Sequence, residues 1–281
     1  MTVVWDMAQV QTSPLFAALR PVLEQADWPR QQWPTLPDYQ VLLDCLPQPV
    51  RTASGARLRV APPALEKSQD WRQGYEPRIY LSGELPTRAS SWHDCFNLLT
   101  WATFPLAKAA LNARHYALLE ARVTTSLAHA TPRTAHQDAL TQFDESGVIV
   151  LSADPSLTAL LKDFQWKTLF WERRTDVLAH MRCFLFGHGL MEKALRPYQG
   201  MTGKGVLLSV SPQTLALPLA AQLTHADHLL ADLIADGQQL LQPRDLAPVP
   251  VLGFPGVTRE NECAAYYDDQ RYFRPGRSAV C

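Results

Sequence analysis

The sequence lacks the features that mark several large classes of protein. Its 281 residues contain no run of about 18 apolar residues, so no membrane-spanning helix is expected. The first residues lack both a basic segment and an extended apolar stretch, and we therefore expect no secretory signal. The formal net charge is −1, so no overall field draws the chain toward nucleic acid or an anionic membrane. No partner can be named from this composition.

Cysteine is sparse and scattered. The five cysteines form no C-x-x-C pair, which argues against a zinc ribbon and against a disulfide framework. Free thiols in a reducing cytoplasm are the simplest interpretation, so we expect a cytoplasmic protein. The sequence also has no G-x-S-x-G and no H-E-x-x-H motif, and the glycines between 200 and 205 lack the spacing of a phosphate-binding loop.

What is present indicates a packed protein. Apolar residues make up 47% of the chain and charged residues 19%, which is typical of a globular fold and unlike a disordered chain. We expect a single domain over 1–281, with an N-terminal part (1–74), a core (75–242) and an extended tail (243–281). The tail is too apolar for a free linker, so it is expected to wrap back over the core.

Local signals predict mainly helices. Capping side chains before prolines, together with apolar periodicity, predict helices over 14–26, 38–45, 91–103, 105–122, 155–163 and 212–236. The stretch 166–196 is predicted to be mainly helical. Hairpins are predicted over 50–60 and 138–151, an extended entry over 75–81 and a strand over 206–210. We therefore expect an α+β fold, mostly helical, with small antiparallel hairpins packed against a helical core.

The segment that begins at Trp92 sets polar side chains among apolar ones. His93 and Asn97 are four residues apart and so share a helical face, where they can bind one ligand, metal or water. Asp94 follows Ser91 at the spacing of a capping box, so it is expected to serve the start of the helix. For His93, a structural and a functional role are equally favoured.

The next predicted helix carries a polar stripe. Lys108, Asn112 and His115 lie on one of its faces, nearly opposite an apolar stripe. The usual meaning of this pattern is a solvated outer face. The functional alternative is a basic surface that faces a cleft.

Acidic side chains mark the predicted hairpin over 138–151. Strand alternation would place Asp138 and Asp144 on one face. Paired carboxylates near a histidine can hold a divalent ion or act as acid and base. Glu145 is interpreted as turn chemistry before Gly147, whereas the role of Asp138 stays open.

His188 is the strongest single candidate. It lies in the middle of an apolar seam of helical period over 177–195. Gly187 and Gly189 flank it and allow another backbone to come close. Glu192, four residues on, can orient the imidazole. The alternative is a core histidine that is hydrogen-bonded to a carbonyl group.

Several of these motifs together resemble a known family. The sequence is similar to the bacterial domain-of-unknown-function family 3025 at Trp92-His93-Asp94-x-x-Asn97, Trp101, Phe104-Pro105, Lys108, Leu111-Asn112, Asp138-Ala-Leu-Thr141, Phe143-Asp144-Glu145, Phe186-Gly187-His188, Leu252-Gly253-x-Pro255-Gly256, Tyr267-Asp268-Asp269 and Phe273-Arg274-Pro275. The resemblance spans about 75–277. It implies a cytosolic protein, mainly from proteobacteria, and it implies no catalytic roles because the family has no established activity.

The leading functional hypothesis is a hydrolase-type, metal-assisted site that acts on a phosphoester or nucleic-acid substrate. We expect catalytic roles for three side chains, namely His93, Asp138 and His188. Binding roles are expected for Arg88, Trp92, Asn97, Lys108, Asp144 and Glu192. The expected cofactor is a divalent metal whose identity the sequence does not specify.

The alternative is a non-enzymatic binding or adaptor protein. Its contact surface would be the aromatic and arginine side chains of the tail, which suit protein interfaces or stacked bases. They are Tyr266, Tyr267, Arg271, Tyr272, Phe273 and Arg274.

Overall fold

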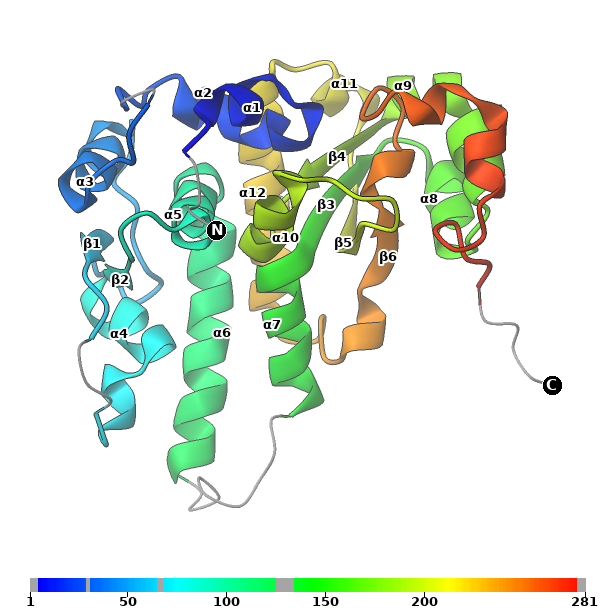
Figure 1. Ribbon diagram of the computed structural model, residues 1–281. Helices are drawn as coiled ribbons and strands as arrows, with labels where there is room; N and C mark the ends of the chain where they lie inside the picture. Colours follow the sequence, from blue (N-terminus) through cyan, green and yellow to red (C-terminus); the bar gives the residue numbers. More distant parts are fainter. Residues whose placement is uncertain (1–4, 29–30, 65–67, 125–133, 277–281) are drawn as a thin grey trace.

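A mixed four-stranded sheet lies between layers of helices in the computed structural model of the protein (Figure 1). The structure describes residues 5–28, 31–64, 68–124 and 134–276. The strands, in their order across the sheet, are β4 (Met181–Leu185), β3 (Gly147–Ser152), β5 (Thr202–Ser209) and β6 (Ala247–Pro250). The central pair β3 and β5 is parallel, and each outer pair is antiparallel. The expected fold class, a mostly helical α+β protein, is confirmed.

Strand β3 is the centre of the core because it is buried along its whole length. Its side chains alternate between the two faces of the sheet. Ile149 and Leu151 belong to the apolar cluster that includes side chains of α6 (Pro105–Thr124), α7 (Ala135–Ser146) and α12 (Leu219–Ala235). Val148 and Val150 belong to the cluster that includes side chains of α8 (Pro155–Lys162) and of the tail. A strand covered on both faces is typical of a layered α/β arrangement and reads as a continuous apolar run.

Two groups of helices pack around the sheet. The first group consists of α5 (Trp92–Thr103), α6 (Pro105–Thr124), α7 (Ala135–Ser146), α10 (His188–Ala194), α11 (Pro212–Leu215) and α12 (Leu219–Ala235). The second consists of α8 (Pro155–Lys162), the π-helical turn η3 (Thr168–Glu172) and α9 (Arg174–His180). Helices α6 and α12 pack along each other, and α7 contacts both β3 and β5 (Figure 1).

The described chain before α5 adds short helices and a second, small sheet. Its helices are α1 (Met7–Thr12), the 3-10 helix η1 (Pro14–Leu19), α2 (Arg20–Leu23), α3 (Leu36–Cys45), the 3-10 turn η2 (Trp71–Gln73) and α4 (Tyr75–Ser82). Strands β1 (Arg59–Ala61) and β2 (Glu84–Pro86) pair in parallel. In the described ranges, no helix is both long and apolar enough to cross a membrane.

The predicted hairpin over 138–151 is wrong. Residues 135–146 form helix α7, and only β3 beyond them is a strand. The helix begins at a capping box in which Thr134 and Gln137 exchange side-chain-to-backbone hydrogen bonds. Leu140 and Phe143 then face the core three residues apart, which is a helical spacing.

The stretch 166–196 is mainly helical, as predicted, because it contains η3, α9 and α10. Strand β4 interrupts it, and α10 begins only at His188. The apolar side chains of β4 fit a helical spacing, but β4 pairs with β3 as a strand. The spacing misleads because a buried strand needs apolar side chains as much as a helix does. The seam around His188 is therefore no continuous helical face.

The remaining predicted helices and strands are confirmed in part. The helices expected over 91–103, 105–122 and 155–163 are confirmed as α5, α6 and α8. The helix over 212–236 breaks before Pro218, and the helix over 14–26 is 3-10 over Pro14–Leu19 and α only over Arg20–Leu23. Residues 75–81 are helix α4, not extended chain; the helix ends at Gly83, whose φ of 70° lies in the left-handed region.

The described part of the tail, residues 243–276, packs onto the core. It contains the 3-10 helices η4 (Pro243–Asp245), η5 (Val251–Gly253), η6 (Glu260–Glu262) and η7 (Ala264–Asp268). The side chains of Tyr267, Tyr272 and Phe273 are buried in the main apolar cluster. The Tyr272 hydroxyl donates to the carbonyl of Met201 at 2.8 Å and accepts from the amide of Leu252 at 3.0 Å.

Tyr272→Phe is expected to destabilise the protein by about 1–3 kcal/mol, because it leaves the buried amide of Leu252 without its partner and leaves the carbonyl of Met201 with only the hydrogen bond from the amide of Val251. Tyr198→Phe is the matched control, since Tyr198 is 52% exposed. Urea denaturation of both variants measures the difference. Equal stabilities would contradict a tail that is hydrogen-bonded into the core.

Candidate functional site

The first turn of α5 fixes one wall of the site. The Ser91 hydroxyl accepts the amide of Asp94 at 3.3 Å, as expected for a helix cap. The Asp94 carboxylate turns instead to Arg88, which donates its backbone amide (2.6 Å), Nε (2.9 Å) and Nη2 (2.7 Å). Burial would raise the pKa of Asp94, but these hydrogen bonds and the Arg88 charge outweigh it and lower the pKa. Arg88 is thereby held at the rim of the site.

The opposite wall forms where the end of α7 meets the start of α10. A Cβ atom on Gly187 would lie 2.3 Å from the amide nitrogen of Gly147, and one on Gly189 would lie 2.4 Å from Glu145 Oε2. Only glycine allows this contact. The prediction that Gly187 and Gly189 admit another backbone is therefore confirmed, and that backbone is the one that carries Glu145.

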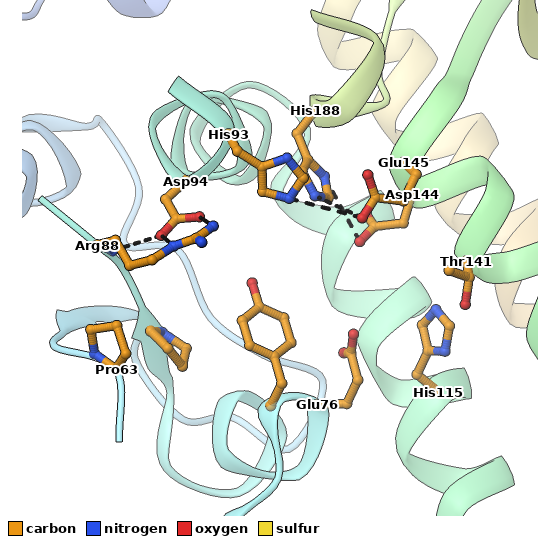
Figure 2. A pocket seen from close by; sticks show the side chains of 12 residues that line it. Pro63, Glu76, Arg88, His93, Asp94, His115, Thr141, Asp144, Glu145 and His188 are labelled. Carbon is orange, nitrogen blue, oxygen red and sulfur yellow. Dashed lines mark hydrogen bonds and ion pairs between the residues drawn. The ribbon is translucent and has the colours of Figure 1, made fainter. Parts of the chain in front are cut away.

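Two histidines from separate helices meet in front of Glu145 (Figure 2). The rings of His93 and His188 lie edge to face, with centroids 4.4 Å apart and planes at 79°. Nε2 of His188 is 3.5 Å from Oε1 of Glu145, and Nε2 of His93 is 3.9 Å from the same oxygen. The Glu145 pKa is lowered, first by the interaction with His188.

The other nitrogen of each ring faces a second carboxylate. His93 Nδ1 lies 3.2 Å from Glu192 Oε2, at hydrogen-bond distance. His188 Nδ1 lies 3.9 Å from Asp144 Oδ2, and no group in the described ranges hydrogen-bonds to it although His188 is only 5% exposed. Each imidazole therefore presents Nε2 to Glu145 and Nδ1 to a carboxylate.

A buried ion pair supports this arrangement from behind. Lys108, which is 4% exposed, bonds Asp144 Oδ1 at 2.5 Å and Asn97 Oδ1 at 2.9 Å. Burial would raise the Asp144 pKa, but the charges of Lys108 and His188 outweigh it and lower the pKa to about 2. Asp144 is therefore a fixed negative charge beside His188.

These groups surround a cavity of about 450 Å³. Its lining comprises Pro63, Tyr75, Glu76, Pro86, Arg88, His93, Asp94, His115, Thr141, Asp144, Glu145 and His188. The Tyr75 hydroxyl accepts a hydrogen bond from Asn97 Nδ2 at 2.6 Å. Tyr75 is 45% exposed as a whole, but desolvation of its hydroxyl and the nearby carboxylates raise the Tyr75 pKa above its ordinary value, so Tyr75 is a neutral donor.

The structure brings together most of the predicted site residues. His93, His188, Arg88 and Asp144 line the cavity. Three further predicted residues contact this lining from behind or beside it, namely Asn97, Lys108 and Glu192.

Two predicted residues do not reach the cavity. Trp92 points into the core, where its ring stacks on Trp5 at 4.6 Å and on Phe96 at 5.3 Å. Asp138 lies in the first turn of α7 and does not line the cavity. It was paired with Asp144 because strand alternation puts every second residue on one face; on a helix, positions six apart diverge.

Eight of the twelve lining residues lie outside the predicted site set, and four of them illustrate why. Glu145 was assigned to a turn, His115 to a solvated face, and Tyr75 and Glu76 to extended chain. The capping box at Thr134 is the signal that would have found Glu145, because it predicts a helix whose last turn contains Asp144 and Glu145.

The chain is a layered α+β protein with a partly buried histidine–carboxylate site, in which His188 is buried while the side chains of His93 and Glu145 are 31% and 44% exposed. Residues 64–277 match the family described as Protein of unknown function (DUF3025), and the chain belongs to this family. No curated protein and no solved structure matches the chain.

Lys108→Met is expected to cost about 3–5 kcal/mol of unfolding free energy, because it leaves the charged Asp144 carboxylate without its ion-pair partner. The double variant Lys108→Met, Asp144→Asn is expected to lose less than the single one, since it removes both charges. Lys162→Met on the exposed face of α8 is the control. A double variant less stable than Lys108→Met would contradict a coupled pair; chemical denaturation of the set measures it.

The stability advantage of the wild type over Asp144→Asn is expected to depend on pH. The folded-state pKa of Asp144, about 2, lies below the ordinary 3.8, so the stabilisation is present above about pH 4 and is lost as the pH falls toward 2. The gap between the two proteins should shrink by about 2 kcal/mol over this interval. Urea titrations at several pH values measure the gap, and a constant gap would contradict the assignment.

Proposed function

We propose that the protein is a cytoplasmic, metal-assisted hydrolase in which His93, Glu145 and His188 bind a divalent cation. One observation carries the proposal: two imidazoles from different helices turn Nε2 toward the same carboxylate oxygen, and each turns Nδ1 toward a further carboxylate. Metal-binding histidines have this arrangement, because the outer carboxylate fixes the tautomer and makes the inner nitrogen more basic.

The spacing of the ligand atoms fits a small cation. One atom from each of the three side chains lies within 4.8 Å of the others. Ligands about 2.1 Å from a tetrahedral ion lie roughly 3.4 Å apart, so a small adjustment of the Glu145 carboxylate and the two rings suffices. Two imidazole nitrogens and one carboxylate oxygen suit Zn²⁺ and leave a coordination position for water or substrate.

The chemistry that such a site supplies is the addition of water to an electrophilic centre. A cation held by His93, Glu145 and His188 would supply Lewis-acid chemistry, which lowers the pKa of water and makes it a nucleophile toward a carbonyl carbon or a phosphorus atom. In such a hydrolysis the bond to the leaving group would break, and the proton released by the water would end on the leaving group. Tyr75 donates a hydrogen bond from the wall of the cavity, where negative charge develops on the substrate oxygen.

Arg88 offers a positive contact at the rim. Its Nε and Nη2 are held by Asp94, whereas Nη1 has no hydrogen-bond partner in the described ranges. A carboxylate or phosphate on the substrate can bind there.

The lining favours a small substrate over nucleic acid. Apart from the histidines, Arg88 is the lining residue that carries positive charge, against four lining carboxylates: Glu76, Asp94, Asp144 and Glu145. A nucleic acid brings a row of phosphates and needs a row of cations. A small ester, amide or phosphoester needs only the metal and Arg88.

The adaptor alternative has lost much of its expected surface. Tyr267, Tyr272 and Phe273 are buried, so these aromatic side chains stabilise the tail and are not free to form a contact surface. Arg271 pairs with Asp269, but its side chain is 88% exposed.

Chelator-treated protein is expected to bind a single Zn²⁺ per chain and to melt at a higher temperature when loaded. Because each variant removes a ligand, Glu145→Gln and His188→Asn should weaken binding on the order of a hundredfold or more. Calorimetry, metal analysis and thermal shifts with Zn²⁺, Mn²⁺ and Mg²⁺ measure this.

His228→Asn, on the exposed face of α12, controls for loss of a histidine away from the cavity. The loaded wild type should hydrolyse members of a panel of nitrophenyl esters, nitrophenyl phosphates and nitroanilides, and Glu145→Gln should not. Absence of stoichiometric binding and of any thermal shift with all three ions would overturn the proposal.

A further inference from the structure

The main cavity adjoins a smaller one that extends between α4 and α6. The smaller cavity has a volume of about 10 Å³, which is room for one water-sized group. Four side chains line both cavities: Tyr75, Glu76, His115 and Asp144. Figure 2 shows Glu76 and His115 across the site from Arg88.

A fixed, unpaired acceptor lines this smaller cavity. Asn112 is 3% exposed, and its Nδ2 donates to Glu76 Oε2 at 2.7 Å and to the Glu76 carbonyl at 3.0 Å. These two acceptors determine which end of the amide is nitrogen. Oδ1 of Asn112 is therefore an acceptor, and it is buried without a hydrogen-bond partner in the described ranges. A buried acceptor of this kind calls for a donor.

The charge at this end of the site is also uncompensated. Arg88 neutralises Asp94, Lys108 neutralises Asp144, and Glu145 faces the two histidines. Glu76, the remaining lining carboxylate, has no ion pair within the described ranges. His115 lines both cavities, but no ion pair joins it to Glu76.

We infer that Glu76 and Asn112 form a subsite for a cationic N–H donor of the substrate, an ammonium or guanidinium group. Both side chains offer acceptors and one of them is charged; the smaller cavity admits one N–H group of the cation, and the rest of the cation lies in the main cavity, which Glu76 also lines. The inference rests on the proposed function for the part of the substrate that reacts. It adds that the substrate carries its positive group on the side of Glu76 while an anionic group can contact Arg88.

The inference is tested with n-butylguanidinium, its neutral analogue n-butylurea, and butyrate as probes of the zinc-loaded protein. Calorimetry should show n-butylguanidinium binding at least tenfold more tightly than n-butylurea or butyrate. Glu76→Gln, which keeps the shape and the contact with Asn112, should weaken guanidinium binding at least tenfold and leave Zn²⁺ affinity unchanged. Glu24→Gln, an exposed site on another helix end, should change neither.

The outcomes separate this inference from the proposed function. If the guanidinium and urea probes bind equally, or Glu76→Gln binds the guanidinium as well as the wild type does, the subsite is rejected and a water fills it, whether or not zinc binds. If zinc fails to bind while the guanidinium still binds in a Glu76-dependent manner, the metal proposal fails and the subsite stands.

Discussion

The candidate site depends on one backbone contact, the approach of the end of α7 to the turn that begins α10. Gly187 and Gly189 leave no Cβ between the two segments, and the amides of Phe186 and Gly187 both donate to the Gly147 carbonyl at 2.9 Å. This contact sets Glu145 in front of His188. It also joins β3 and β4 directly to the site, because both strands run into it.

The charges around the site form layers that follow from this contact. Glu145 and the inner nitrogens of His93 and His188 make the inner layer, and Asp144 and Glu192 make the outer one. Asp144 and Glu145 stay charged, because Lys108 and the histidines lower the pKa values of these two acids. Under the proposal, a divalent ion at the inner layer would add to this stabilisation, and the outer carboxylates would hold the histidines in the tautomer that binds it.

Local signals are enough for the part of the site that lies on α5. A capping serine and helical spacing place His93 and Asn97 on one face of this helix, because these determinants act within a few residues. On α6 the favoured interpretation of the polar stripe as a solvated outer face is wrong, since Lys108 and Asn112 are buried. The glycines that flank His188 also predict the close backbone approach.

The remainder of the site depends on pairings that no local pattern specifies. Strand β4 has the apolar spacing of a helix and becomes a strand because β3 lies beside it. Asp138 was misplaced because the alternation of 138–144 imitates a strand, while the capping box at Thr134 makes it a helix. That His93 meets His188, 95 residues later in the chain, follows only from the packing of α5 against α10.

X-ray absorption spectroscopy at the zinc edge of the loaded protein tests most directly whether His93, Glu145 and His188 bind the metal. We expect two imidazole nitrogens and one or two carboxylate oxygens at about 2.0–2.1 Å from the zinc, with solvent completing the coordination. A shell of water oxygens alone, sulfur ligands, or a spectrum unchanged by Glu145→Gln and His93→Asn would contradict this expectation.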